Sequence, residues 1–170
     1  MWLGLGVSTN LEPPASAVWG GYLLAVLVAI CAIDARFGII PDTLVIYLAA
    51  GGLLQLLGQE WETVLQRLAA GALLFLGGCL LRTIYRVLRN RDGLGFGDVK
   101  FVLAGAPWIG LEGVPTLLLL AVTSATVSLV ILRVSGERLS RSDAISFGPH
   151  LAVALWLVWV VGPYHFANAL

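Results

Sequence analysis

Residues 18–34 read VWGGYLLAVLVAICAID, an apolar run that contains no charged side chain until its last residue, Asp34. A helix that crosses the hydrocarbon core of a bilayer needs about 20 mainly apolar residues, and this run reaches that length with its flanks. An ionisable side chain at the edge of such a segment is costly in free energy, so its presence suggests a function. The run therefore predicts a membrane helix that carries a functional carboxylate near its end.

The composition of the whole chain also indicates a membrane environment. Hydrophobic residues make up 59% of the 170 residues, charged residues make up 12%, and the mean hydropathy is +0.92. Soluble domains carry about 25% charged residues. The formal net charge is zero, so a nucleic-acid partner is not expected. Cys31 and Cys79 lie within apolar runs and form no CxxC motif, so we expect no metal site, no redox site and no cofactor.

Six apolar segments can be distinguished, separated by glycine, proline and charged residues. They cover residues 18–33, 44–57, 64–84, 99–111, 116–134 and 151–161. Gly113 and Pro115 mark the expected start of the fifth segment. The pattern predicts an all-α membrane protein, a single domain over residues 1–170 that forms a bundle of about six transmembrane helices.

The basic residues are concentrated on one side of this predicted bundle. All lysines and arginines except Arg67 lie at or after the end of the first, third or fifth segment, or at the start of the fourth. Because cytoplasmic loops carry an excess of Lys and Arg, this asymmetry predicts cytoplasmic basic loops and both chain termini outside the cytoplasm. Asp34 and a second aspartate, Asp98, then both lie at the cytoplasmic face.

Asp98 belongs to the stretch GFGDVK, residues 95–100. As a structural residue, Asp98 would cap the helix that follows it. Gly95 and Gly97 add the capacity for positive φ and for close backbone approach, so the turn could deliver the Asp98 carboxylate to a partner. Lys100 is expected to anchor the helix at the membrane interface, or alternatively to bias the neighbouring acid electrostatically.

Asp34 also has a structural alternative, which is a helix-end charge paired with Arg36. A little further along the chain, Pro41 and Asp42 precede the second apolar segment. This pattern is typical of a helix start, so Asp42 is expected to cap the second helix, in preference to a catalytic role.

A pair formed by Asp34 and Asp98 would have the chemistry to activate water for peptide hydrolysis. One carboxylate acts as base toward the water and the other, protonated, acts as acid toward the scissile carbonyl. Two like charges held close cannot both ionise easily, so the pair shares one proton and titrates as a unit. The sequence therefore does not say which of the two is the base.

Two other classes of function remain open at this point. Intramembrane acids also mark ion pathways, so a small proton-coupled transporter is one alternative. A non-catalytic assembly protein of the same fold is another. The peptidase is favoured because both acids fall on the same side and no ionisable residue is expected at mid-depth in a span.

Together with Phe147-Gly148-Pro149, these elements resemble the motifs of the type IV prepilin peptidase family, which are GxGD-type intramembrane aspartyl proteases. The resemblance extends over nearly the whole chain. It implies that Asp34 and Asp98 are the catalytic pair. It also implies supporting roles for Gly95, Gly97, Lys100, Pro41, Asp42, Gly148 and Pro149.

The resemblance further implies the substrates and the location. Prepilins or pseudopilins would be cleaved at the cytoplasmic face of the bacterial inner membrane, with membrane lipid around the enzyme. Longer members carry a region with paired CxxC motifs that is linked to methylation of the new N-terminus. This sequence has no such motif, so peptidase activity alone is expected. Ser146 and His150 flank the Phe-Gly-Pro element, and His150 is expected to be an interfacial polar residue without a catalytic role.

Overall fold

The computed structural model describes residues 13–89, 95–135 and 146–161, and within these ranges the regular elements are all helices. They are α1 (Pro13–Phe37), α2 (Asp42–Leu54), α3 (Trp61–Arg89), α4 (Phe96–Val134) and α5 (Gly148–Val161). The prediction of an all-α protein is confirmed for these residues. Four of the helices contain one predicted apolar segment each, with small shifts at their ends.

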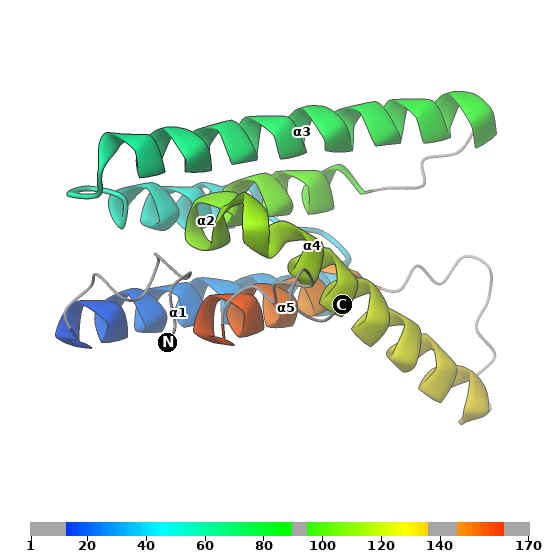
Figure 1. The fold of residues 1–170 in the computed structure, drawn as a ribbon. Coiled ribbons are helices and arrows are strands. Elements are labelled where there is room, and N and C mark those ends of the chain that lie inside the picture. The colour runs from blue at the N-terminus through cyan, green and yellow to red at the C-terminus, as the bar shows by residue number, and fades with distance from the viewer. Residues whose placement is uncertain (1–12, 90–94, 136–145, 162–170) are drawn as a thin grey trace, which may run out of the picture.

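Helix α4 contains both the fourth and the fifth predicted segments. A break between the two segments is confirmed, but its predicted position at Gly113 and Pro115 is wrong. The helical path is interrupted at Gly110, where φ is 68° and ψ is 176°. This φ lies in the left-handed region, which glycine enters without the steric penalty of a side chain. The break divides α4 into two straight parts that point in different directions (Figure 1).

The helices form a layered bundle around the first part of α4. Helix α3 lies on one side, α1 and α5 lie side by side on the other, and α2 and the start of α4 lie between them (Figure 1). Helix α4 contacts α2, α3 and α5, while α1 contacts α2 and α5. After the break, α4 first packs in the core through Val114, Leu117 and Ala121, and its later residues then extend away from the bundle (Figure 1). This arrangement brings the start of α4 and the start of α5 to the same end of the molecule as the end of α1.

The core is built around Trp108, whose side chain is fully buried on α4. Its indole N–H donates a hydrogen bond of 2.8 Å to the carbonyl of Leu48 on α2. Tyr22 of α1 stacks on the indole with 6.3 Å between the ring centroids. A Cβ atom at Gly52 would lie 2.9 Å from both Pro107 and Trp108, so α2 approaches α4 closely because this residue has no side chain. Trp108 thus joins three helices.

The break at Gly110 exposes a backbone carbonyl that the chain satisfies from another helix. In an unbroken helix the carbonyl of Pro107 would accept from the amide of residue 111, which lies beyond the break. Instead it accepts hydrogen bonds from Arg67 at 2.6 Å and from Gln55 at 3.3 Å. Arg67, the one basic residue that the sequence placed away from the others, is therefore a buried structural cation of α3.

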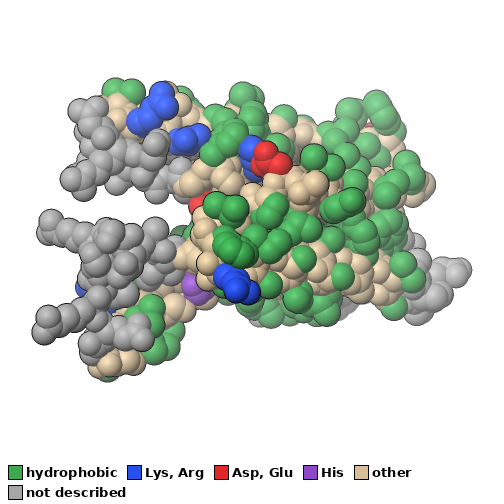
Figure 2. All heavy atoms as spheres, turned by 180° about the vertical axis from the view of Figure 1, so that it is seen from behind, with side chains coloured by type: hydrophobic (Ala, Val, Ile, Leu, Met, Phe, Trp, Pro, Cys, Tyr) green, Lys and Arg blue, Asp and Glu red, His purple; other side chains and the backbone are tan. Residues whose placement is uncertain are grey.

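The outside of the bundle is apolar. Hydrophobic side chains are spread over the whole described part of the face that Figure 2 shows, and few charged ones interrupt them. Large exposed ones include Leu73, Leu76 and Leu80 on α3 and Val122 and Val130 on α4. Three described helices have stretches long and apolar enough to cross a membrane: Ala17–Phe37, Trp61–Ile84 and Phe96–Val134. The chain is therefore a helical membrane protein, while six separate spans and the orientation of the termini stay predictions.

Candidate active site

Asp34 lies near the end of α1 and is buried, with 5% of its surface exposed. Its Oδ2 atom accepts a hydrogen bond of 2.8 Å from the backbone N–H of Gly148 and another from the hydroxyl of Ser146. Helix α1 ends just after it, where Gly38 takes a φ of 65° and donates its N–H to the Asp34 carbonyl at 2.8 Å. This left-handed glycine is a common helix C-terminal signal, and it leaves the Asp34 side chain facing the start of α5.

Gly148 is the residue against which the Asp34 carboxylate packs. A Cβ atom at this position would lie 2.8 Å from Cγ of Asp34 and 3.1 Å from its Cβ, both closer than normal contact. Pro149 follows as the second residue of α5, where its missing N–H removes no intrahelical hydrogen bond. The Phe-Gly-Pro element therefore starts α5, and its glycine provides both the space and the N–H for Asp34.

Asp98 lies in the first turn of α4 and is half-buried, but it is not the residue that caps the helix. The N-cap is Gly95, with φ of −59°, so the expected capping role of Asp98 is wrong. Of the two capacities that glycine offers at this turn, positive φ is not used, because the described glycines with positive φ are Gly38, Gly58 and Gly110. A Gly-rich turn before an acid is compatible with an N-cap at the glycine or at the acid. The sequence pattern does not distinguish these two helix starts, but the backbone conformation does.

The two glycines of this turn provide space instead. A Cβ atom at Gly95 would lie 2.8 Å from Oδ2 of Asp98, so the carboxylate folds back over the turn. A Cβ atom at Gly97 would lie 3.3 Å from Cβ of Ile40, which belongs to the connection between α1 and α2. Gly97 therefore lets the start of α4 approach the segment that follows Asp34.

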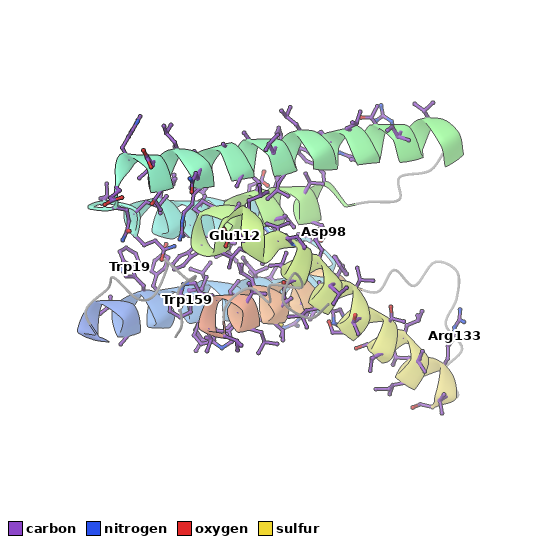
Figure 3. The ribbon with its side chains drawn as sticks, in the orientation of Figure 1. Trp19, Asp98, Glu112, Arg133 and Trp159 are labelled. Atoms are coloured by element: carbon purple, nitrogen blue, oxygen red, sulfur yellow. The ribbon has the colours of Figure 1, made fainter. Side chains whose placement is uncertain are left out.

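Asp34 and Asp98 come from different helices and lie at the same end of the bundle, near enough for the charge of Asp34 to disfavour a charge on Asp98. Figure 3 shows Asp98 at the start of α4, away from Trp19, Trp159 and Glu112, which lie toward the other end. The sequence prediction that the two acids share one end of the bundle is thus met by the geometry. Two carboxyl groups placed at the same end of the bundle could act together as a general acid and a general base.

Asp42 and Lys100 form an ion pair close to this site. The Lys100 ammonium is 2.7 Å from Oδ1 of Asp42 and lies 4.6 Å from the centre of the Phe96 ring. Asp42 makes no capping hydrogen bond, because Pro41 is the N-cap residue of α2, so the expected capping role of Asp42 is wrong. The pair links the start of α2 to the start of α4, and Lys100 has a partner that its expected anchoring role did not include.

Sequence reasoning assigned no role to Ser146, which the structure places against the Asp34 carboxylate. The signal available was its position next to the Phe-Gly-Pro element. His150 does not take part in this contact, since its Nδ1 atom is 3.1 Å from the hydroxyl of Ser124 on α4. Within residues 13–89, 95–135 and 146–161, no three His, Cys, Asp or Glu side chains are grouped so that they could hold a metal ion.

The sequence profile of the type IV leader peptidase family matches residues 21–130, a range that includes Asp34, Asp42 and Asp98. The chain belongs to this family. It is 35% identical over 146 residues to a prepilin leader peptidase/N-methyltransferase of Dickeya chrysanthemi, which covers 85% of this chain and 51% of that protein.

Two further relatives of this chain have the same name. This chain is 31% identical over 167 residues to the protein of Aeromonas hydrophila, and the match covers 94% of this chain and 55% of the relative. It is 30% identical over 149 residues to a protein of Xanthomonas campestris pv. campestris, covering 85% and 51%. The chain thus spans about half the length of the curated relatives it matches. No solved structure matches it significantly.

Proposed function

We propose that this member of the leader peptidase family is a membrane aspartyl endopeptidase that removes the leader peptide of type IV prepilins or pseudopilins. The observation that carries the proposal is that Asp34, at the end of α1, and Asp98, at the start of α4, lie at the same end of the bundle, near enough for the charge of one to act on the other. The family membership and the names of the relatives support the substrate class.

The proposed reaction uses the two carboxylates and one water molecule. One carboxylate takes a proton from the water, whose oxygen attacks the carbonyl carbon of the scissile peptide bond. The other, protonated, gives its proton to the carbonyl oxygen. In the second step this proton returns from the tetrahedral intermediate to the carboxylate that gave it. The carbon–nitrogen bond breaks, and the carboxyl group that took the water proton gives that proton to the leaving nitrogen. The products are a carboxylic acid and an amine, and the dyad regains its starting proton.

Basic residues gather at the end of the bundle that carries the pair. Arg36, Arg82 and Arg86 belong to the ends of α1 and α3 that lie at this end of the bundle. By the positive-inside rule, we propose that this end faces the cytoplasm at the bacterial inner membrane. A scissile bond just ahead of an apolar helix would then lie at the depth of Asp34 and Asp98.

The residues around the dyad have supporting roles in this proposal. Gly148 and Pro149 set the start of α5 against Asp34, and Gly95 and Gly97 leave space at the start of α4. Pro41, Asp42 and Lys100 hold the start of α2 near that of α4.

The test is leader cleavage in membranes that contain Asp34→Asn or Asp98→Asn. Each substitution keeps the size of the side chain but removes its capacity to exchange the catalytic proton, so each should abolish processing of a prepilin while the protein still accumulates. Glu62→Gln, at an exposed acid in the first turn of α3, is the matched control and should process normally. Full processing by either asparagine variant would reject the two-aspartate mechanism.

A further inference from the structure

We propose that Ser146 and the backbone N–H of Gly148 keep Asp34 ionised, so that Asp34 is the base that takes the proton from water and Asp98 is the acid that protonates the scissile carbonyl oxygen. Ser146 is a positioning residue in this assignment, because it acts through Asp34. The inference rests on the proposed two-aspartate peptidase and adds a role for each member of the pair.

The two donors converge on one oxygen atom. The Gly148 N–H lies 2.8 Å from Oδ2 of Asp34, and the Ser146 hydroxyl reaches the same oxygen. A backbone N–H donates and cannot accept, so it stabilises an oxygen that carries negative charge and opposes one that carries a proton. No donor among the described residues hydrogen-bonds Oδ1, which is left as the oxygen that can take the proton of a water.

The direction of α5 adds to this effect. Gly148 is the first residue of a helix that continues to Val161. The amino end of a helix carries a partial positive charge, so an anion is favoured where Asp34 meets it. The hydrogen bonds from residues 146 and 148 show that the carboxylate is held at this helix end and does not merely pass near it.

Asp98 has fewer neighbouring groups that favour its charged form than Asp34 has. No donor in the described part of the chain hydrogen-bonds its carboxylate. Lys100, two residues away, directs its ammonium to Asp42 at 2.7 Å and to the Phe96 ring. Asp98 is half-buried, which disfavours a charge there, and a second negative charge would also face that of Asp34. The shared proton is therefore better accommodated on Asp98.

The other titratable groups at this end of the bundle have their own contacts. Arg36, on the same helix as Asp34, lies over the Phe37 ring at 5.6 Å. His150 of α5 contacts the Ser124 hydroxyl. Asp42 of α2 is paired with Lys100 of α4. Arg82 of α3 lies over the Phe96 ring at 5.1 Å, next to the start of α4. Among the described groups at this end, Asp98 is one whose charge interacts with that of Asp34.

The experiment measures cleavage of a prepilin by the purified full chain across a range of pH. Ser146→Ala removes one donor from the Asp34 carboxylate. We expect kcat to fall about tenfold with little change in KM, which is the lower end of the effect of a hydrogen bond to a charged group. The acid limb of the pH–rate profile should move about one unit toward higher pH, and the basic limb should stay in place.

Ser146→Thr keeps a hydroxyl and should restore both the rate and the acid limb, while Ser146→Cys, a weaker donor of similar size, should lie between Thr and Ala. Ser124→Ala is the matched control, because Ser124 is a half-buried serine whose hydroxyl donates to the Ala121 carbonyl and contacts His150, with no hydrogen bond to Asp34. It should leave the profile unchanged. The Thr and Cys variants keep the comparison meaningful if the alanine variant folds poorly.

Two results would overturn the inference. A shift of the basic limb in Ser146→Ala, with the acid limb fixed, would exchange the roles of the two aspartates. A wild-type rate and profile in Ser146→Ala would remove Ser146 from the mechanism. If Asp34→Asn and Asp98→Asn are inactive in the same assay, either result rejects this inference alone, whereas activity in one of those variants rejects the proposed function itself.

Discussion

Gly148→Ala is the substitution for which the structure gives the sharpest expectation. The new Cβ atom would lie 2.8 Å from Cγ of Asp34 and 3.1 Å from its Cβ. Carbon atoms pack at about 3.5–4.0 Å, so the contact is too short by about 1 Å. Since Cβ of Asp34 is crowded as well, a rotation of its side chain does not relieve the contact. Either the carboxylate leaves Ser146 and the Gly148 N–H, or α1 and α5 separate.

The magnitude follows from this displacement. A misplacement of about 1 Å in a catalytic group can cost roughly 100-fold in rate, equivalent to about 2.7 kcal/mol of transition-state stabilisation. Overpacking of a buried contact also lowers the free energy of unfolding, by about 1–3 kcal/mol. We therefore expect kcat/KM for prepilin cleavage to fall about 100-fold in purified Gly148→Ala, together with a lower thermal midpoint.

The matched control is Gly21→Ala, on the helix that carries Asp34. No atom lies within 4 Å of a Cβ built at Gly21. Alanine in a helix interior is favoured over glycine by about 0.5–1 kcal/mol, so this variant should be active and at least as stable as the wild type. If Gly148→Ala retains wild-type kcat/KM, the working enzyme does not hold Asp34 against the start of α5, and the reasoning fails.

Three further expectations concern the surroundings of the site. Asp42→Asn or Lys100→Gln should lower the free energy of unfolding by about 0.2–1 kcal/mol, because the ion pair between α2 and α4 is largely exposed. A double-mutant cycle on unfolding should give a coupling energy of that size, and strict additivity would contradict the link. Arg67→Met should lower the free energy of unfolding by about 1–3 kcal/mol, because the buried Pro107 carbonyl loses its 2.6 Å donor; an unchanged thermal midpoint would contradict this. Reporter fusions to the connection between α3 and α4 should report the cytoplasm, and an extracytoplasmic signal would overturn the proposed orientation.

Much of the helical architecture could be predicted from the order of apolar residues. The expected segment at residues 18–33 lies within α1, and the one at residues 64–84 lies within α3. Long apolar runs are detected because their transfer from water into lipid has a large favourable free energy that adds up residue by residue. The break at Gly110 was missed because Gly113 and Pro115 are equally plausible breakers, and the choice depends on which carbonyl another helix can satisfy. Arg67 and Gln55 decide it by donating to Pro107.

The candidate site divides in the same way. The sequence by itself determined that Asp34 and Asp98 lie at the ends of apolar segments on the basic side, since charge placement and hydropathy are properties of the chain read in order. Only the tertiary structure decided that Ser146 and Gly148 hold Asp34, that Asp42 pairs with Lys100, and that the glycines of the Asp98 turn provide space rather than a positive φ. The physical reason is that these contacts join residues from different helices. Their distances are set by how the helices pack, and local sequence patterns contain no record of that packing.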